Sequence, residues 1–319
     1  MAARKAGLPH ALLIHGPRGI GKLNFARALA QALLCESPLT NGDACGSCGA
    51  CAWFANGGHP DFCQTEPARA SEEESDNSEK KATITVHQIR ALAGFVNVSS
   101  QRGGVKAVVI HPAEALNANA ANALLKSLEE PPPRTYFLLV SHRPHQLLPT
   151  IKSRCQKVAL RAPDMPAAAA WLAEQGIRDA ELALAHVGSA PLLALELSGT
   201  EYWGARSAFL RHLTGNDIDV IAAAEATRDC PIPDVIAWLQ KWSYDLVHYQ
   251  AVGSVRYNPD QRDAIGRAAA KADPLDTLRF HREMVDLQRN AQHPLNARLF
   301  VEQVLIAYRD LVQPQAAHV

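Results

Sequence analysis

A glycine-rich segment near the start of the chain has the residues of a phosphate-binding loop. Gly16, Gly19 and Gly21 precede Lys22 in the sequence GPRGIGK, between an apolar run and a helical pattern. Glycines let backbone N–H groups close around phosphate oxygens, the start of a helix favours negative charge, and the lysine can reach the outer phosphates. The segment predicts a nucleotide-binding loop, and the alternative is a glycine-rich turn with a surface lysine.

The residues that would hold magnesium beside this loop are missing. Leu23 occupies the position where a Ser or Thr hydroxyl would bind Mg²⁺. The apolar run 107–110 ends in His111 and Pro112, where an Asp would hold the metal and a Glu would polarise water. We expect Glu114, which lies past the proline, to be a surface residue. Hydrolysis is therefore not expected, and nucleotide binding by this chain should be weak or absent.

Five of the seven cysteines are crowded into one segment. Cys45, Cys48 and Cys51 follow one another at intervals of three, with Cys35 before them and Cys63 after them. In a cytosolic chain such crowding suggests a metal site rather than disulfides, and four thiolates make a closed tetrahedral zinc site whose metal is structural. A redox pair, a cluster of unbound thiols and iron–sulfur ligation are the alternatives.

The composition is that of a globular chain without a dominant charge. With 319 residues, 47% of them hydrophobic, the chain is long enough for two or three packed domains. Lys plus Arg and Asp plus Glu both number 32, so no global field draws the chain to nucleic acid, and any DNA contact must be local or shared. No apolar stretch approaches the roughly 18 residues of a membrane helix, and the N-terminus lacks the apolar core of a secretory signal. We expect a cytoplasmic protein.

The first half of the chain alternates short apolar runs with helical patterns. The elements predicted in this way span residues 11–15, 22–34, 107–111, 119–129 and 135–141. Such alternation predicts an α/β fold with a parallel sheet wrapped by helices. The polar segment 70–81 predicts a solvated, mobile loop. After Arg161 only helical patterns follow, separated by glycines and prolines.

Two further motifs carry a family resemblance. The sequence NALLKSLEEPP over residues 122–132 is followed by an apolar strand and then by Ser153-Arg154-Cys155. Together they closely resemble the clamp-loader family of AAA+ proteins. The resemblance also takes in the phosphate loop, the cysteine cluster and the tripeptide HPD at 59–61, over roughly half of the chain. The C-terminal helices match only in length and helical character.

The resemblance implies a function for Arg154. In this family the arginine of the SRC motif, flanked here by Ser153 and Cys155, is a finger that reaches the γ-phosphate of ATP held by the adjacent subunit. A rigid guanidinium can stabilise charge on the transferring phosphoryl group, and supplying it in trans makes hydrolysis depend on assembly. Without the family, Arg154 is an exposed or ion-paired arginine.

The resemblance also implies ligands and losses. The zinc ligands of the family correspond to Cys35, Cys45, Cys48 and Cys51, and Cys63 lies outside that set. Active subunits carry an arginine in a Gly-Ser-x-Arg sequence that touches the nucleotide, whereas this chain has Pro191 at the arginine's position. A proline offers no charge. This pattern of losses resembles the family members that do not hydrolyse ATP.

Domains and partners follow from the same resemblance. It implies an AAA+ (P-loop NTPase-like) domain over 1–162 with a four-cysteine zinc module at 35–51, a small helical lid over 163–202, and an all-helical collar for oligomerisation over 203–319. It further implies a hetero-pentameric ring with ATPase subunits of the tau/gamma type and a delta subunit. Through that complex the chain would meet the sliding clamp and primer–template DNA, and no membrane.

Three other functions are compatible with single motifs. An active AAA+ clamp-loader ATPase would need substitutes for the missing acids, and Leu23, His111, Pro112 and Pro191 all disfavour it. A P-loop nucleotide kinase would need metal ligands and an acceptor pocket, for which no motif is present. A zinc-ribbon nucleic-acid binder would need basic and aromatic residues among the cysteines, and these are lacking between Cys45 and Cys51.

Overall fold

The computed structural model describes residues 7–67, 83–101, 104–215, 218–290 and 297–313. The whole of the predicted loop 70–81 lies outside these residues. The chain divides into two compact units, Met1–Ala162 and Pro163–Val319. The first contains a sheet and the second, in its described part, contains helices alone. The proposed border between a lid and a collar at residue 202 stays a prediction.

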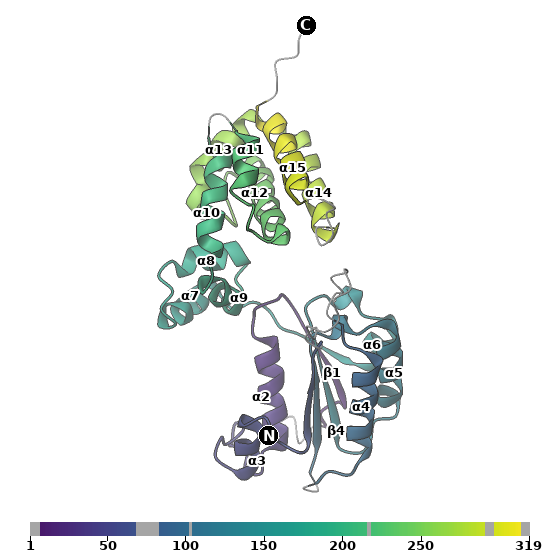
Figure 1. Ribbon diagram of the computed structural model, residues 1–319. Coiled ribbons are helices and arrows are strands. Elements are labelled where there is room, and N and C mark those ends of the chain that lie inside the picture. Colours follow the sequence, from purple (N-terminus) through teal and green to yellow (C-terminus); the bar gives the residue numbers. More distant parts are fainter. Residues whose placement is uncertain (1–6, 68–82, 102–103, 216–217, 291–296, 314–319) are drawn as a thin grey trace. The chain divides into compact units, whose positions relative to one another are not determined.

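The first unit is built on five parallel strands in the order β2-β3-β4-β1-β5. These are β1 (Ala11–His15), β2 (Phe62–Thr65), β3 (Lys106–Ile110), β4 (Thr135–Ser141) and β5 (Gln156–Ala159). Helices α2 (Lys22–Leu34) and α3 (Gly49–Ala55) lie on one face of the sheet. Helices α4 (Val86–Asn97), α5 (Ala118–Glu129) and α6 (Pro149–Arg154) lie on the other face (Figure 1). The predicted α/β fold class is confirmed.

Alternate residues of β1 show how the sheet is covered. Leu13 packs with α4 and α5, whereas Leu12 and Ile14 pack with α2 and α3. Successive side chains of a strand point to opposite faces, so a strand covered on both faces must be apolar throughout. This requirement explains why ALLI (11–14) and AVVI (107–110) are continuous apolar runs.

The element boundaries follow local signals. The predicted elements 11–15, 22–34 and 135–141 have the same bounds as β1, α2 and β4. Helix α5 begins one residue earlier than predicted because the side chain of Asn117 caps it, accepting a hydrogen bond from the backbone N–H of Ala120 (2.8 Å). Helix α4 was not predicted, although Thr85 and Gln88 form a capping box at its start that is readable from the sequence.

The second unit consists of helices around two apolar clusters. Helices α7 (Met165–Glu174), α8 (Ala180–Val187) and α9 (Pro191–Ser198) enclose the smaller cluster. The larger cluster is enclosed by α10 (Tyr202–Leu213), α11 (Val220–Glu225), α12 (Ile232–Val252), α13 (Arg262–Lys271), α14 (Pro274–Asn290) and α15 (Ala297–Val312). Among the described residues no single helix is long and apolar enough to cross a membrane; α8 and α9 pass that test only when they are counted together across a 113° bend.

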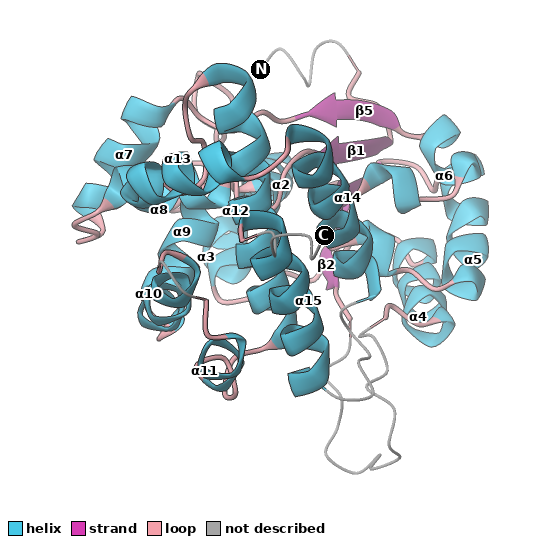
Figure 2. Ribbon diagram, turned by 90° about the horizontal axis from the view of Figure 1, so that it is seen from above, coloured by secondary structure: helices cyan, strands magenta, loops and turns pink. Residues whose placement is uncertain are grey.

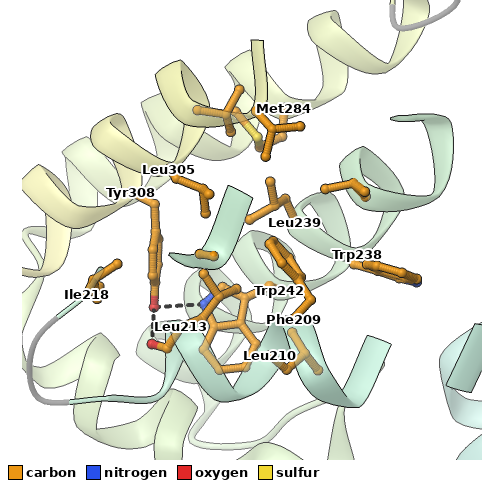
Figure 3. Packing of buried hydrophobic residues seen from close by; sticks show 14 of the residues in the cluster. Phe209, Leu210, Leu213, Ile218, Trp238, Leu239, Trp242, Met284, Leu305 and Tyr308 are labelled. Atoms are coloured by element: carbon orange, nitrogen blue, oxygen red, sulfur yellow. Dashed lines mark hydrogen bonds between the residues drawn. The ribbon is translucent and has the colours of Figure 1, made fainter. Parts of the chain in front are cut away.

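Two polar aromatic groups are satisfied inside the larger cluster. The indole N–H of Trp242 donates to the hydroxyl of Tyr308 (3.0 Å), which donates in turn to the backbone carbonyl of Leu213 (3.4 Å; Figure 3). These bonds join α12, α15 and α10. A buried polar group costs stability unless it is hydrogen-bonded, so this chain of bonds favours one arrangement of the three helices.

Arg206 of α10 should be a large single contributor to the stability of the second unit. It is 1% exposed and donates from both terminal nitrogens to the carboxylate of Asp260 (2.9 and 3.0 Å), and from Nη2 to Asn258 Oδ1 (2.7 Å). We expect Arg206→Ala to lower the free energy of unfolding by about 3 kcal/mol, measured by urea denaturation. This is the lower end of the range for a broken buried pair, because Asp260 is partly exposed.

The matched control is Arg228→Ala, which removes a solvent-exposed pair with Glu225 and should change stability by less than about 1 kcal/mol. Burial raises the pKa of Asp260, but the hydrogen bonds and charge of Arg206 outweigh this and hold the pKa below its usual value. The contribution of the pair should therefore be full above pH of about 4 and lost as the pH falls through the lowered pKa. Equal effects of the two alanine variants would contradict this account.

Candidate phosphate loop, arginine finger and metal site

The predicted phosphate loop connects β1 to α2 at the carboxyl end of the sheet. Gly21 precedes the helix with φ of 90°, in the left-handed region that favours glycine. At Gly16 a Cβ atom would lie 2.3 Å from the backbone oxygen of Leu160, so no side chain fits there. At both positions the conformation of the loop therefore requires a glycine.

Lys22 is turned onto its own loop. Its side chain is 2% exposed, and Nζ donates a hydrogen bond to the backbone carbonyl of Pro17. Burial lowers the pKa of Lys22 to about 8, and the charge of Glu114 acts in the opposite direction. The ammonium group thus already has an acceptor within the loop that would hold phosphate.

The expectation that Glu114 is a surface residue is wrong. The short helix η1 (Ala113–Ala115) directs its half-buried carboxylate towards the end of β4. Oε1 accepts hydrogen bonds from the backbone N–H groups of His142 (2.9 Å) and Arg143 (3.1 Å). This negative charge lies close enough to Lys22 to affect its pKa. The proline did not prevent the approach, because the turn after it returns the chain towards the sheet.

Two histidines meet where the strands β3 and β4 end. Nε2 of His111 and Nε2 of His142 are 3.2 Å apart, and Nδ1 of His111 lies 3.2 Å from Oε1 of Glu66. Burial, followed by the charge of Lys22, lowers the pKa of His142 to about 4, so that this ring is neutral at pH 7. Mg²⁺ prefers oxygen ligands. An imidazole pair is therefore a poor replacement for the acids of a hydrolytic site.

Arg154 is the last residue of α6 and is 34% exposed at its side chain. Nη1 donates to the backbone carbonyl of Thr150 (3.0 Å) and lies 3.3 Å from Ser153 Oγ, and Nη2 forms an ion pair with the carboxylate of Glu129. Ser153 is exposed, whereas Cys155 is buried and its pKa is raised by that burial to about 11. Of the three motif residues, only Arg154 presents a charged group to solvent.

Arg154 lies at the amino end of β5, whereas the phosphate loop lies at the carboxyl end of the neighbouring strand β1. β5 begins directly after Cys155 and runs parallel to β1 (Figure 2). In this pairing Gln156 lies beside Leu12. The phosphate loop follows the other end of β1 at Gly16. Four residues at about 3.3 Å each separate these two strand ends by roughly 13 Å. An arginine side chain is shorter than that, so Arg154 does not reach the phosphate loop of its own chain.

The structure brings together the four cysteines that the sequence predicted as ligands. The Sγ atoms of Cys35, Cys45, Cys48 and Cys51 lie within 4.8 Å of one another. The Cys35–Cys48 and Cys45–Cys51 sulfur distances are 3.9 and 4.0 Å. Tetrahedral zinc with Zn–S bonds of about 2.3 Å requires sulfur atoms about 3.8 Å apart, so the cluster fits such an ion. Cys63, in β2, is outside the cluster.

The electrostatics of the cluster also suit a cation. Backbone N–H groups of Ser47 and Cys48 stabilise the thiolate of Cys45 and lower its pKa to about 6. Burial raises the pKa of Cys51 to about 12. Four thiolates cannot all be charged at neutral pH without compensation, and a divalent metal ion supplies that compensation. The cluster could therefore hold a metal ion.

Comparison with known proteins decides the family. Residues 1–164 match the family model described as DNA polymerase III, delta subunit, and residues 200–310 match the one described as DNA polymerase III, delta subunit, C terminal. The DNA polymerase III subunit delta′ of Pseudomonas aeruginosa is 41% identical over 248 residues, which are 76% of this chain and 72% of that protein. The chain belongs to the DNA polymerase III delta′ family.

Two further relatives are also subunits of DNA polymerase III. The delta′ subunit of Yersinia pestis is 30% identical over 97% of this chain and 89% of its own length. The DNA polymerase III subunit tau of Escherichia coli is 35% identical over 156 residues, which are 49% of this chain and 22% of tau. The resemblance to the clamp-loader family is thereby confirmed, and this chain is related in sequence to tau.

Three contacts in this chain could not be predicted from the sequence. Glu114 beside Lys22, the pair of His111 and His142, and the ion pair of Glu129 with Arg154 each join residues from different elements. Their separations along the chain carry no periodic signal. Only the strand order, which places the ends of β3 and β4 side by side, could have indicated the first two.

Proposed function

We propose that this chain is a clamp-loader subunit of DNA polymerase III that does not hydrolyse ATP and that presents Arg154 to ATP held by a neighbouring subunit. The position of Arg154 carries the proposal, because Arg154 lies at the amino ends of the strands, opposite the carboxyl ends where its own phosphate loop lies. An arginine in that place can act only on a phosphate held by another chain. Supplied in trans, its charge would stabilise the transferring phosphoryl group.

The phosphate loop of this chain supports the same proposal. Leu23 offers no ligand to Mg²⁺, and the ends of β3 and β4 carry a histidine pair instead of acids. Lys22 already donates to Pro17 within the loop. Phosphoryl transfer is catalysed by positioning and by charge around Mg²⁺, and neither is provided here. The chain would act as a fixed part of the assembly whose own nucleotide binding is weak or absent.

Partners follow from the proposed role. We propose assembly with ATPase subunits of the tau/gamma type and a delta subunit in a hetero-pentameric ring in the cytoplasm. Through the ring the chain would help to load the sliding clamp on primer–template DNA during replication. Exposed apolar residues support a contact surface on the C-terminal helices: Leu299 and Ile306 are seven residues apart on α15, and Ile221 lies on α11, which packs against α15.

The metal of the cysteine cluster is proposed to be zinc with a structural role. Sulfur ligands at these distances favour zinc, and four protein ligands leave no position for a substrate.

The domain division predicted from the sequence is also proposed. It comprises the AAA+ domain 1–162, the lid 163–202 and the collar 203–319.

The test of the proposed function compares the purified chain with the reconstituted complex. We expect the chain alone to show no ATP turnover above the buffer blank, with Lys22→Ala indistinguishable from it, whereas a complex with tau/gamma and delta hydrolyses ATP in response to primed DNA. Omission of this chain should abolish that response. Turnover by the chain alone that Lys22→Ala removes would instead support an active ATPase with unrecognised metal ligands.

A further inference from the structure

Arg154 and Glu129 meet although they come from the ends of two different helices. Glu129 is the last residue of α5, in the NALLKSLEEPP motif, and Arg154 is the last residue of α6, in the SRC motif. Their side chains form an ion pair between Nη2 and Oε1. The two motifs that identify the family are therefore in direct contact through one acid and one base.

The guanidinium of Arg154 has three acceptors. Besides the carboxylate of Glu129, it contacts the backbone carbonyl of Thr150 (3.0 Å) and Ser153 Oγ (3.3 Å). A surface arginine without such partners samples many rotamers. A planar group whose two terminal nitrogens are both engaged has its direction set, while its remaining N–H donors are still available.

The two helix ends are themselves fixed by a common core. Leu128, next to Glu129, and Ile151 of α6 are both buried in the apolar cluster beneath this face of the sheet. Glu129 is thus attached to the same rigid base as Arg154. A supporting carboxylate can orient a catalytic group only if it does not move independently of that group, and this condition is met.

We infer that Glu129 is a positioning residue, which sets the direction of the Arg154 guanidinium before it meets a phosphate on the neighbouring subunit. The inference rests on the proposed trans action of Arg154. Both side chains of the pair are partly exposed, 34% for Arg154 and 48% for Glu129, so water screens their attraction. Glu129 therefore acts by orienting the guanidinium of Arg154 and not by adding binding energy. Its loss should leave the stability of the chain unchanged.

The test uses the reconstituted complex, with ATP turnover stimulated by primed DNA as the readout. We expect Glu129→Ala to remove at least about half of the turnover that Arg154→Ala removes, with the KM for ATP and the assembly of the complex unchanged. Glu129→Gln should recover part of the loss, because its amide oxygen accepts the same hydrogen bond. Glu130→Ala is the matched control: among the described residues Glu130 forms no ion pair with Arg154, and its variant should behave as the unmodified chain.

A double variant separates the two proposals. If Glu129 acts through Arg154, adding Glu129→Ala to Arg154→Ala should cause no further loss. Losses that multiply, or a Glu129→Ala complex that is faster than or equal to the unmodified one while Arg154→Ala is impaired, would overturn the positioning role and leave the trans finger standing. An unimpaired Arg154→Ala complex would instead refute the proposed function itself.

Discussion

Replacement of Arg154 by alanine is expected to slow ATP hydrolysis at the site of the adjacent subunit by about 10³-fold. An arginine supplied in trans to a phosphoryl-transfer site contributes about 10³ to 10⁵ in rate, and we expect the lower end because the side chain is 34% exposed in this chain. The measurement is DNA-stimulated turnover of the reconstituted complex. The other ATP sites in the ring keep their own arginines. The loss of turnover measured for the whole complex is therefore the part of the turnover that the adjacent site contributes.

Arg154→Lys separates charge from geometry. Lysine retains the positive charge but lacks the planar fork, so this variant should remain nearly as slow as Arg154→Ala. The control is Lys157→Ala, which removes an exposed cation from the neighbouring strand β5 and should leave turnover unchanged. Assembly, followed by size-exclusion chromatography, should be the same for all three variants. A normal rate for an assembled Arg154→Ala complex would exclude the finger role.

Removal of one thiolate is expected to release the metal ion. Cys51→Ser replaces the most buried ligand of the cluster, and we expect the affinity for zinc to fall by more than about 100-fold, because even the loss of an outer-shell partner costs about 10–100-fold. The measurement is zinc content after dialysis, together with competition against a chromophoric chelator. Cys230→Ser removes a thiol from the other unit and should retain one zinc ion for each chain.

Loss of the ion should also disorder the segment that it organises. None of the residues 36–49 is buried, so this stretch has no apolar core of its own, and metal binding is the available source of stability. We expect chelator treatment to make it sensitive to proteolysis. Full zinc retention by Cys51→Ser would contradict the ligand set, and visible absorption typical of an iron–sulfur cluster would replace zinc with that alternative.

Local signals accounted for much of the first unit. The apolar runs 11–15 and 135–141 and the helix 22–34 have the predicted bounds, because a strand buried on both faces must be apolar throughout and glycines define the loop before the helix. The short elements α3 and β5 were not predicted. Three of the four residues of β5 are exposed, so its sequence carries no apolar run.

The position of Glu114 differs from the one predicted from its neighbours in the sequence. Two residues after Pro112, it was expected at the surface, but the turn at η1 brings its carboxylate to the backbone N–H groups at the end of β4. Those groups come from residues 28 and 29 positions away in the sequence. A hydrogen bond of that kind depends on which strands are neighbours, and strand order is not encoded in any local pattern.

The sequence by itself determined the α/β class, the missing magnesium ligands and the crowding of four cysteines, because each depends on residue type and short spacing. The role expected for Arg154 came from the family resemblance and stays a prediction. The tertiary structure alone decided which groups surround them. The fold placed Arg154 at the amino ends of the strands, opposite its own phosphate loop, and joined it to Glu129. It also put Glu114 and a neutral histidine beside Lys22. These relations arise when packing brings together residues that are distant along the chain, and the free energy of those contacts depends on burial and direction, which a linear sequence does not specify.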